Sequence, residues 1–326
     1  MSFSILRKFD KVYPLIHGLY PVDVFANKIR TLLYFMYNRY FLKSPGRFQP
    51  PEVLYQSTNF LVVNKPYDVL VNSGEETEYS VATQLKDSFP ELVDETCVHH
   101  FRFTHRLDFA TSGILVLALN KKAAAYMQKQ FVKRKVWKHY LALVGGYLSE
   151  PYILVDVPIG KDSLITHKHK MCTVFSEGCT DIRDAVTLVI LLEQGLYNGA
   201  PASKVLLVPY TGRTHQLRVH CNIIGHTIIG DYTYSNGKDS IPHRMMLHAY
   251  GLGAPSLKEP LNILSPDPFT SQADAKWKPH KVFITYNDVI KEDLSLDSIR
   301  LKQTSGYCTI SVKTDENKPD ITYVCF

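Results

Sequence analysis

The chain has 326 residues, of which 45% are hydrophobic, so it can form a sizeable core and wholesale disorder is excluded. Its formal net charge is +6, and residues 1–49 alone, with eight Lys or Arg and two Asp, account for it. The rest of the chain is balanced in charge, so a contact with a polyanion there must come from a local basic patch. No run of 18 apolar residues occurs, which argues against a membrane-spanning helix.

Two extensions flank the predicted main domain, which covers residues 50–255. Residues 1–49 are basic and aromatic, and Asp23 can cap a helix over about residues 24–42. This segment contains no Glu, which leaves two interpretations open: a mitochondrial presequence or an ordinary basic extension. We therefore expect an intracellular protein, cytoplasmic or mitochondrial. Residues 256–326 are expected to be packed at first and then to form a polar tail.

Hydrophobic periodicity predicts a main domain dominated by strands. The predicted strands are 60–64, 114–119, 136–144, 185–192, 204–208, 226–229 and 247–252, with a turn at 195–201. Asn120 caps a predicted helix that runs to Phe131, and Thr214 is expected to cap a second helix, which Gly225 ends. Neighbouring strands with few inserted helices indicate an α+β fold with a largely antiparallel mixed sheet.

The cysteines are spread over the chain without a CxxC pair. They are Cys97, Cys172, Cys179, Cys221, Cys308 and Cys325. Because a chain of this length and apolar content needs no covalent cross-links, we expect free thiols in a reducing compartment. His167 and His169 lie near two of the cysteines, but alternating His and Lys are more typical of a solvated loop than of a zinc site.

The most informative segment is THRLDFATSG, residues 104–113, which is followed by the apolar run 114–119. It places Asp108 between Arg106 and a Thr-Ser-Gly turn, at the mouth of a predicted buried strand. A carboxylate at such a position is held rigidly, as a catalytic group must be. Taken alone, an Arg-x-Asp sequence is more often a solvated ion pair or a helix cap.

Two later segments carry groups that suit such a carboxylate. Lys138 and Tyr140 share one face of the strand 136–144. Residues 212–220, GRTHQLRVH, hold two Arg, two His and one Gln. A guanidinium keeps a nearby carboxylate ionised, and a tyrosine offers a flat face for a base and a hydroxyl for proton transfer. Each of these residues also has an ordinary structural interpretation.

Four strings occur in the order HRLDFATSGILVLALN, KHYLALVGG, TGRTHQLRVHCNIIGHTIIGD and MMLHA. Over about residues 53–252 they resemble the RluA-type pseudouridine synthases, which show His-Arg-Leu-Asp-x-x-Thr-Ser-Gly, Lys-x-Tyr and Gly-Arg-Thr-His-Gln-Leu-Arg in this order. The resemblance implies the sheet of that family and the isomerisation of specific uridines in RNA to pseudouridine. The target base would be flipped out of its stack, and an aspartate would drive the exchange of the glycosidic bond.

The resemblance also implies roles for individual residues. Asp108 matches the catalytic aspartate, Tyr140 the active-site tyrosine, and Arg218 the arginine that pairs with the aspartate. The expected substrate-binding residues are Arg106, His105, Lys138, Arg213, His215 and Gln216. The family needs no cofactor and no metal. We expect RNA (tRNA, rRNA or mRNA) as the partner, and a monomeric chain.

The chain departs from the family pattern in one loop. Asp68 stands where the family has a glycine, and Asn72-Ser73 replaces a His-Pro. Since Asp tolerates positive φ better than most residues, we expect altered loop geometry and retained chemistry.

Other functions and first steps stay open at this point. One alternative is a non-catalytic RNA-binding or RNA-folding module on the same fold. Another is a hydrolase that uses Asp108 and His105, although the sequence places no second carboxylate or metal for it. For an isomerase, three first steps are open: attack on the sugar, attack on the base, and removal of the C2′ proton.

Overall fold

The computed structural model describes residues 51–73, 79–164, 170–239, 242–255, 258–301, 307–315 and 318–325. The chain separates into two units, Met1–Pro50 and Pro51–Phe326. The predicted helix at 24–42 therefore lies outside the described residues, and so do His167 and His169. No helix in the described part of the chain is long and apolar enough to cross a membrane.

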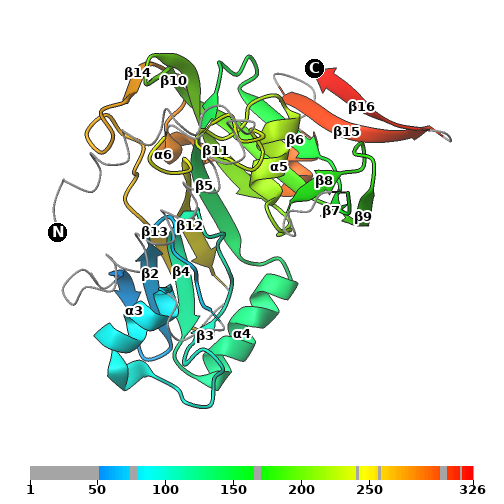
Figure 1. The fold of residues 1–326 in the computed structure, drawn as a ribbon. Helices are drawn as coiled ribbons and strands as arrows, with labels where there is room; N and C mark the ends of the chain where they lie inside the picture. Colours follow the sequence, from blue (N-terminus) through cyan, green and yellow to red (C-terminus); the bar gives the residue numbers. More distant parts are fainter. Residues whose placement is uncertain are drawn as a thin grey trace, which may run out of the picture. The chain divides into compact units, whose positions relative to one another are not determined.

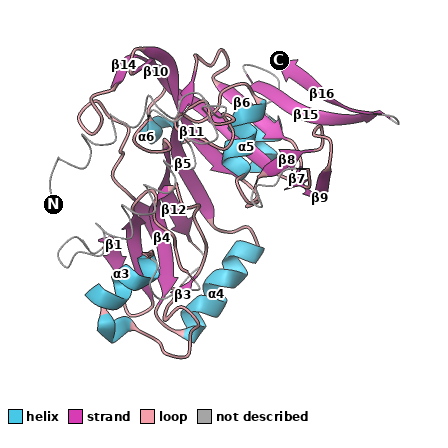
Figure 2. Ribbon diagram, in the orientation of Figure 1, coloured by secondary structure: helices cyan, strands magenta, loops and turns pink. Residues whose placement is uncertain are grey.

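One large sheet and one small sheet form the framework (Figures 1 and 2). The large sheet contains β1 (Glu52–Gln56), β2 (Phe60–Lys65), β3 (Arg102–Phe103), β4 (Ser112–Ala118), β5 (Trp137–Gly145), β6 (Tyr152–Asp156), β10 (Val186–Tyr197), β11 (Ala200–Pro209), β12 (Leu247–Ala254), β13 (Leu261–Leu264), β14 (Trp277–Val282), β15 (Tyr307–Asp315) and β16 (Lys318–Cys325). The small sheet contains β7 (Ile159–Asp162), β8 (Met171–Thr173) and β9 (Cys179–Arg183).

The helices of the described residues are few and short. They are α3 (Val81–Ser88), η1 (Pro90–Leu92), α4 (Lys121–Val132), α5 (Gln216–Ile223), α6 (Tyr286–Val289) and α7 (Leu296–Leu301). The main path of the large sheet is β1-β2-β4-β12-β5-β11-β10-β6-β15-β16. Among its described pairs, β4 with β12 and β6 with β15 are parallel, and the others are antiparallel. The α+β prediction with a largely antiparallel mixed sheet is confirmed.

The alternating side chains of β2 and β4 place a helix on each face of this part of the sheet. Phe60, Val62, Ile114 and Val116 pack with Ala123 and Met127 of α4. Leu61, Val63, Leu115 and Leu117 pack with Val81 and Leu85 of α3. Both helices flank these strands in Figure 2. Because both faces are covered, the strands read as continuous apolar runs, which is the pattern that predicted them.

Helix α4 and the hairpin lie where the sequence predicts them, but the hairpin strands are longer than predicted, because β10 runs to Tyr197 and β11 begins at Ala200. Helix α4 begins after Asn120, whose side chain accepts a hydrogen bond from the Ala123 amide at 2.9 Å. The predicted hairpin is formed by β10 and β11, and its turn is Asn198-Gly199, with φ values of 50° and 85°. Positive φ at both central residues is the hairpin geometry that an Asn-Gly pair favours.

Two local expectations are wrong. Thr214 does not cap α5, because His215 occupies that position with φ 55° and makes no side-chain cap bond. The predicted strand at 226–229 is an isolated bridge between Ile228 and Val144. A turn follows immediately, closed by the Asp231 amide on the Ile228 carbonyl, and it ends the pairing.

The C-terminal extension adds strands that the sequence analysis did not predict. Strand β15 pairs in parallel with β6, and β16 pairs antiparallel with β15, so these two strands continue the large sheet at its edge. Their partner β6 lies about 150 residues earlier in the chain, and a local sequence pattern does not reveal such a long-range pairing.

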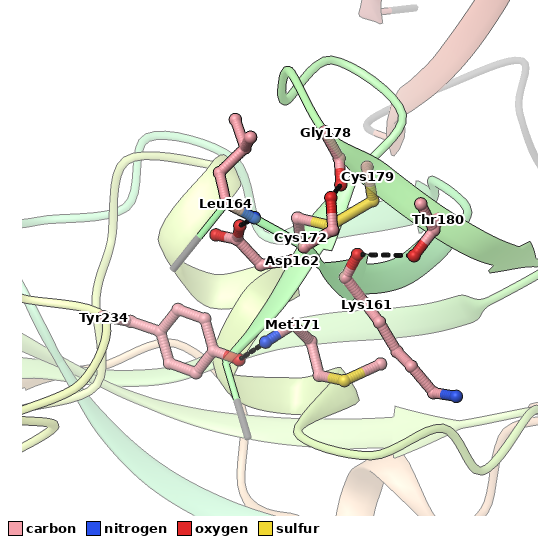
Figure 3. Close-up of a disulfide and its surroundings, with 10 residues drawn as sticks. Lys161, Asp162, Leu164, Met171, Cys172, Gly178, Cys179, Thr180 and Tyr234 are labelled. Atoms are coloured by element: carbon pink, nitrogen blue, oxygen red, sulfur yellow. Dashed lines mark hydrogen bonds between the residues drawn. A yellow bond between two sulfur atoms is a disulfide. The ribbon is translucent and has the colours of Figure 1, made fainter. Parts of the chain in front are cut away.

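The expectation of free thiols is wrong for one pair. Cys172 and Cys179 form a disulfide with a Cα–Cα distance of 5.9 Å, and it links β8 to β9 (Figure 3). Chain length and apolar content describe the main core, whereas this small sheet is mostly exposed along β9. Cys97, Cys221 and Cys308 are free thiols.

Candidate active site

Asp108 lies in the loop between β3 and β4, and this loop is fixed at both ends. Thr104 donates its hydroxyl to the Val116 carbonyl at 2.8 Å, and the Thr111 amide donates to the Asp108 carbonyl at 3.1 Å. Leu107 is buried among the side chains of β2, β4 and α3. The Asp108 side chain remains 29% exposed. A buried neighbour and a closed turn therefore hold this carboxylate in place while solvent and substrate can still reach it.

The sheet register brings Tyr140 close to this loop. Ala249 of β12 pairs with Gly113 of β4 on one side and with Tyr140 of β5 on the other. Gly113 has φ 110°, and a Cβ there would lie 2.2 Å from the Ala249 carbonyl oxygen, so only glycine allows this close approach. The Thr-Ser-Gly turn thus seats the loop against β12, one strand away from Tyr140.

Arg218 of α5 joins Asp108 to a second carboxylate. Its Nη1 lies 3.5 Å from Asp108 Oδ2, while Nε and Nη2 donate to Asp231 Oδ2 and Oδ1 at 2.7 and 2.8 Å. Asp231 also accepts the backbone amides of Thr233 and Tyr234. Burial opposes the charge on Arg218, but the hydrogen bonds and charge of Asp231, together with Asp108, raise the pKa of its guanidinium. Asp231 therefore fixes the orientation of the guanidinium that faces Asp108.

His215 and Tyr234 form a second layer beside this pair. The Met171 amide donates to the Tyr234 hydroxyl at 3.0 Å, and that hydroxyl lies 3.1 Å from His215 Nδ1. The Tyr234 hydroxyl can therefore donate a hydrogen bond to His215 Nδ1. The neutral imidazole then carries its own proton on Nε2, which lies 3.9 Å from Asp108 Oδ2. The Arg218 guanidinium also lies 5.0 Å from the centroid of the Tyr234 ring. Figure 3 shows the Tyr234 contact with Met171, next to the disulfide.

Tyr140 and Lys138 lie on one face of β5, and the pKa values of both side chains are shifted. Burial, and secondarily the charge of Asp108, raise the pKa of Tyr140, so its phenol stays protonated at neutral pH. Burial lowers the pKa of Lys138 to about 8. No anion pairs with Lys138 among the described residues, and its Nζ lies beside the turn at Gly212. Lys138 is therefore a cation that a phosphate or a base carbonyl would stabilise.

The other predicted substrate-binding residues divide into two groups. Gln216 is buried, and its amide is hydrogen-bonded to Thr211, Arg213, Val186 and Thr187, so it supports the turn before α5.

His105 also contacts protein. Its Nε2 accepts the Val116 amide at 3.1 Å, and burial lowers its pKa to about 4. In contrast, Arg106 is exposed, and its side chain makes no hydrogen bond or ion pair with the described residues. Arg213 is half-exposed and donates its Nε to the Asp184 carbonyl. The two arginines are thus the flanking groups that remain open to a ligand.

Sequence reasoning missed Asp231 and Lys65. Asp231 closes the string TGRTHQLRVHCNIIGHTIIGD, so its place at the end of a shared motif was an available signal. Lys65 is fully buried, and its ammonium donates to the carbonyls of Pro66, Val69 and Phe109 at 2.9, 2.7 and 3.0 Å. A lysine is rarely buried, so no local signal predicts this arrangement. It ties the loop after β2 to the residue that follows Asp108.

Asp68 lies in that same loop and adopts φ 55°. This is the left-handed conformation for which a glycine would be the usual residue, and Asp accommodates it as the sequence analysis supposed. No group of three or more His, Cys, Asp or Glu within the described ranges has the geometry of a metal site. Cys172 and Cys179 are bonded to each other and offer no thiolate to a metal.

The sequence model of the RNA pseudouridylate synthase family matches residues 59–222. The chain is 48% identical over 252 residues to the zebrafish (Danio rerio) RNA pseudouridylate synthase domain-containing protein 1, covering 77% of this chain and 86% of that one. It is 36% identical over 210 residues to the Escherichia coli K12 dual-specificity RNA pseudouridine synthase RluA, covering 62% and 88%.

Solved structures agree with these sequence matches. The human RNA pseudouridylate synthase domain containing 1 structure superposes with a TM-score of 0.68 at 41% identity, covering 76% of this chain and 96% of that one. The human RNA pseudouridylate synthase domain containing 4 structure gives a TM-score of 0.54 at 25% identity, covering 77% and 100%.

Proposed function

Because the chain belongs to the RNA pseudouridylate synthase family, we propose that it isomerises specific uridines in RNA to pseudouridine. The observation that carries the proposal is the Asp231–Arg218–Asp108 arrangement, with Asp108 part-exposed at its open end. A carboxylate that is held rigidly beside a fixed cation is ready to act as a nucleophile or a base.

The reaction exchanges two bonds at the ribose. The N1–C1′ bond of uridine breaks and a C5–C1′ bond forms, while the proton leaves C5 and N1 gains one, so the product is an isomer of the substrate. Asp108 begins the exchange, and Arg218 stabilises its charge. Neither step requires a cofactor electron or a metal-bound water.

Tyr140 is proposed to hold the uracil ring while it is detached. Its half-buried ring can pack on the base, and its protonated phenol can donate a hydrogen bond. Lys138 and the exposed Arg106 are proposed to contact the phosphates or the gap left by the flipped base, as charge and exposure favour. Arg213 and His215 complete the proposed substrate-binding set.

The test is a uridine-specific map of modified positions in RNA from cells that lack the protein. Wild-type protein should restore the lost sites, and Asp108→Asn should restore none of them. Restoration of every site by Asp108→Asn would exclude the proposed mechanism. Release of tritium from C5 of labelled uridine in RNA separates the isomerase from a module that only binds or refolds RNA.

The hydrolase alternative has less support. It requires His105 to act with Asp108, but the His105 Nε2 is occupied by the Val116 amide and its ring packs near Phe131, at 5.5 Å between ring centroids. Asp231 cannot serve as the second carboxylate that a hydrolase requires, because it is buried behind Arg218.

A further inference from the structure

Two exposed aromatic side chains lie in the two loops that meet at Lys65. Phe109, next to Asp108 in sequence, is 41% exposed, and Tyr67 is 39% exposed. We call these two residues the aromatic rim. Large aromatic side chains are usually at least partly covered, because each carries a large apolar surface. These two rings lie in adjoining loops, one of which carries Asp108, so they leave aromatic surface for a ligand next to the candidate active site.

The backbone beneath the rim is rigid. The Phe109 carbonyl accepts hydrogen bonds from Lys65 Nζ at 3.0 Å and from the Val69 amide at 3.3 Å. Lys65 also donates to the Pro66 and Val69 carbonyls, on either side of Tyr67. One buried ammonium thus fixes both loops, so exposure of the rings does not come from a loose backbone.

The two rings are held differently. Tyr67 lies over the buried guanidinium of Arg244, 4.6 Å from its ring centroid, and Arg244 is itself bonded to Ser112 and to the Leu247 carbonyl. The Phe109 ring belongs to no hydrophobic cluster and stacks on no other ring in the described part of the chain. Tyr67 is therefore braced by Arg244, and the exposed part of the Phe109 ring is an apolar surface that a ligand can reach.

We propose that the aromatic rim is a stacking subsite for the nucleobases on either side of the target uridine. This inference rests on the proposed function. A uridine that leaves its stack to reach Asp108 exposes the faces of its neighbours, and an aromatic ring is the side chain that replaces a lost stacking partner. Phe109 follows Asp108 directly, so the Cα atoms of the two residues lie about 3.8 Å apart.

The charges around the rim favour RNA over an apolar protein partner. Arg106, two residues before Asp108 in the same loop, is exposed and provides a cation for a phosphate. Every nucleobase has a π-face, so stacking here is tolerant of sequence and should operate on a short single strand as well as on the natural substrate.

The test is a cycle of protein and RNA changes. The probe is a short fluorescein-labelled single-stranded RNA of mixed sequence with one central uridine, and two versions of it with an abasic site on the 5′ or the 3′ side of that uridine. Wild-type protein should bind each abasic version about tenfold more weakly than the intact strand. Phe109→Ala should bind the intact strand about tenfold more weakly and lose nothing further with one of the two abasic versions.

Matched variants separate loss of stacking from loss of side-chain volume. Phe109→Trp should retain the difference in affinity between intact and abasic RNA, and Phe109→Leu should lose it. Phe283→Ala is the control, because Phe283 is 40% exposed but lies after β14; it should behave as wild type. Tyr67→Leu should remove the difference for the base on the opposite side of the uridine.

Three results would overturn the subsite. The first is that wild type fails to bind the intact strand, and the second is that Phe109→Ala binds it with wild-type affinity. The third is that the losses of affinity from Phe109→Ala and from each abasic site multiply, which would show that the two changes are independent. C5 tritium release is measured in parallel on labelled cellular RNA. If Phe109→Ala and an abasic site are coupled in their effect on affinity but no tritium is released, the subsite is supported and the proposed function is wrong. If tritium is released without such coupling, only the subsite is wrong.

Discussion

Arg218 and Asp231 form a buried two-point pair, with Nε and Nη2 of the guanidinium at 2.7 and 2.8 Å from the two carboxylate oxygens. The remaining terminal nitrogen, Nη1, lies 3.5 Å from Asp108. A planar guanidinium that is held at two points has little freedom to turn. Asp231 thereby determines where the positive charge meets Asp108, although it does not face the substrate itself.

Asp231→Asn should therefore separate positioning from binding. The amide keeps the shape of the side chain but lacks its charge, so Arg218 loses its fixed orientation. We expect kcat to fall at least about tenfold with little change in KM, and the free energy of unfolding to fall by about 3 kcal/mol. Single-turnover rates and urea unfolding measure the two effects.

The control for Asp231→Asn is Asp288→Asn, which breaks the exposed pair between Asp288 and Lys291. It should change the free energy of unfolding by less than about 1 kcal/mol and leave turnover unchanged. Wild-type turnover in Asp231→Asn would contradict the positioning role.

Tyr140 allows the ring and the hydroxyl to be tested separately. Burial raises its pKa, so the phenol keeps its proton and can donate it. Tyr140→Phe should retain RNA affinity, because the ring remains, but lose about 100-fold in kcat. Tyr140→Leu should lose both. If Tyr140→Phe turns over as fast as wild type, the hydroxyl has no part in the reaction.

Much of this arrangement could be predicted from the sequence. The apolar runs that predict β2 and β4 are continuous because both faces of these strands are covered. The motifs shared with the family are sufficient to assign Asp108, Tyr140 and Arg218 to one predicted site. Asp231 was missed because its partner Arg218 had already been assigned to Asp108. A sequence does not show that one guanidinium serves two carboxylates.

Other features depend on contacts that local patterns do not contain. Gln216 looks like a polar residue near a site, yet four protein groups use its amide. The buried position of Lys65 follows from three carbonyls that converge from two loops. The pairing of β15 with β6 depends on chain segments that are far apart in sequence.

Lys65 should make stability depend on pH in the alkaline range. Burial lowers its pKa to about 7 in the folded protein, whereas an unfolded lysine has a pKa of about 10.4. Between these values the unfolded chain binds the extra proton, so the free energy of unfolding should rise with pH, by at most about 1.4 kcal/mol per pH unit. Below the folded pKa this contribution is constant and unfavourable.

The comparison for Lys65 is Lys65→Met, measured by urea unfolding from about pH 6.5 to about pH 9.5, a range that begins just below the folded pKa and ends below the unfolded one. Wild type should gain stability relative to Lys65→Met as the pH rises. Lys161→Met is the control, because the Lys161 side chain is 68% exposed, and its difference from wild type should stay flat. A flat difference for Lys65→Met would contradict a depressed pKa.

The disulfide should stabilise the small sheet locally and, through it, the contact behind His215. The cross-link closes a loop between residues seven apart, for which the chain-entropy estimate is about 2–3 kcal/mol. Met171 is adjacent to Cys172, and its amide holds the Tyr234 hydroxyl. Reduction with a dithiol should therefore speed hydrogen exchange at residues 171–173 and 179–183, with little change in the strands β2 and β4.

The double variant Cys172→Ser with Cys179→Ser should exchange fast with or without the dithiol. Cys97→Ser, which alters a free thiol, should respond to the dithiol as wild type does. Equal exchange in oxidised and reduced wild type would mean that hydrogen bonds to β7 alone hold this sheet together.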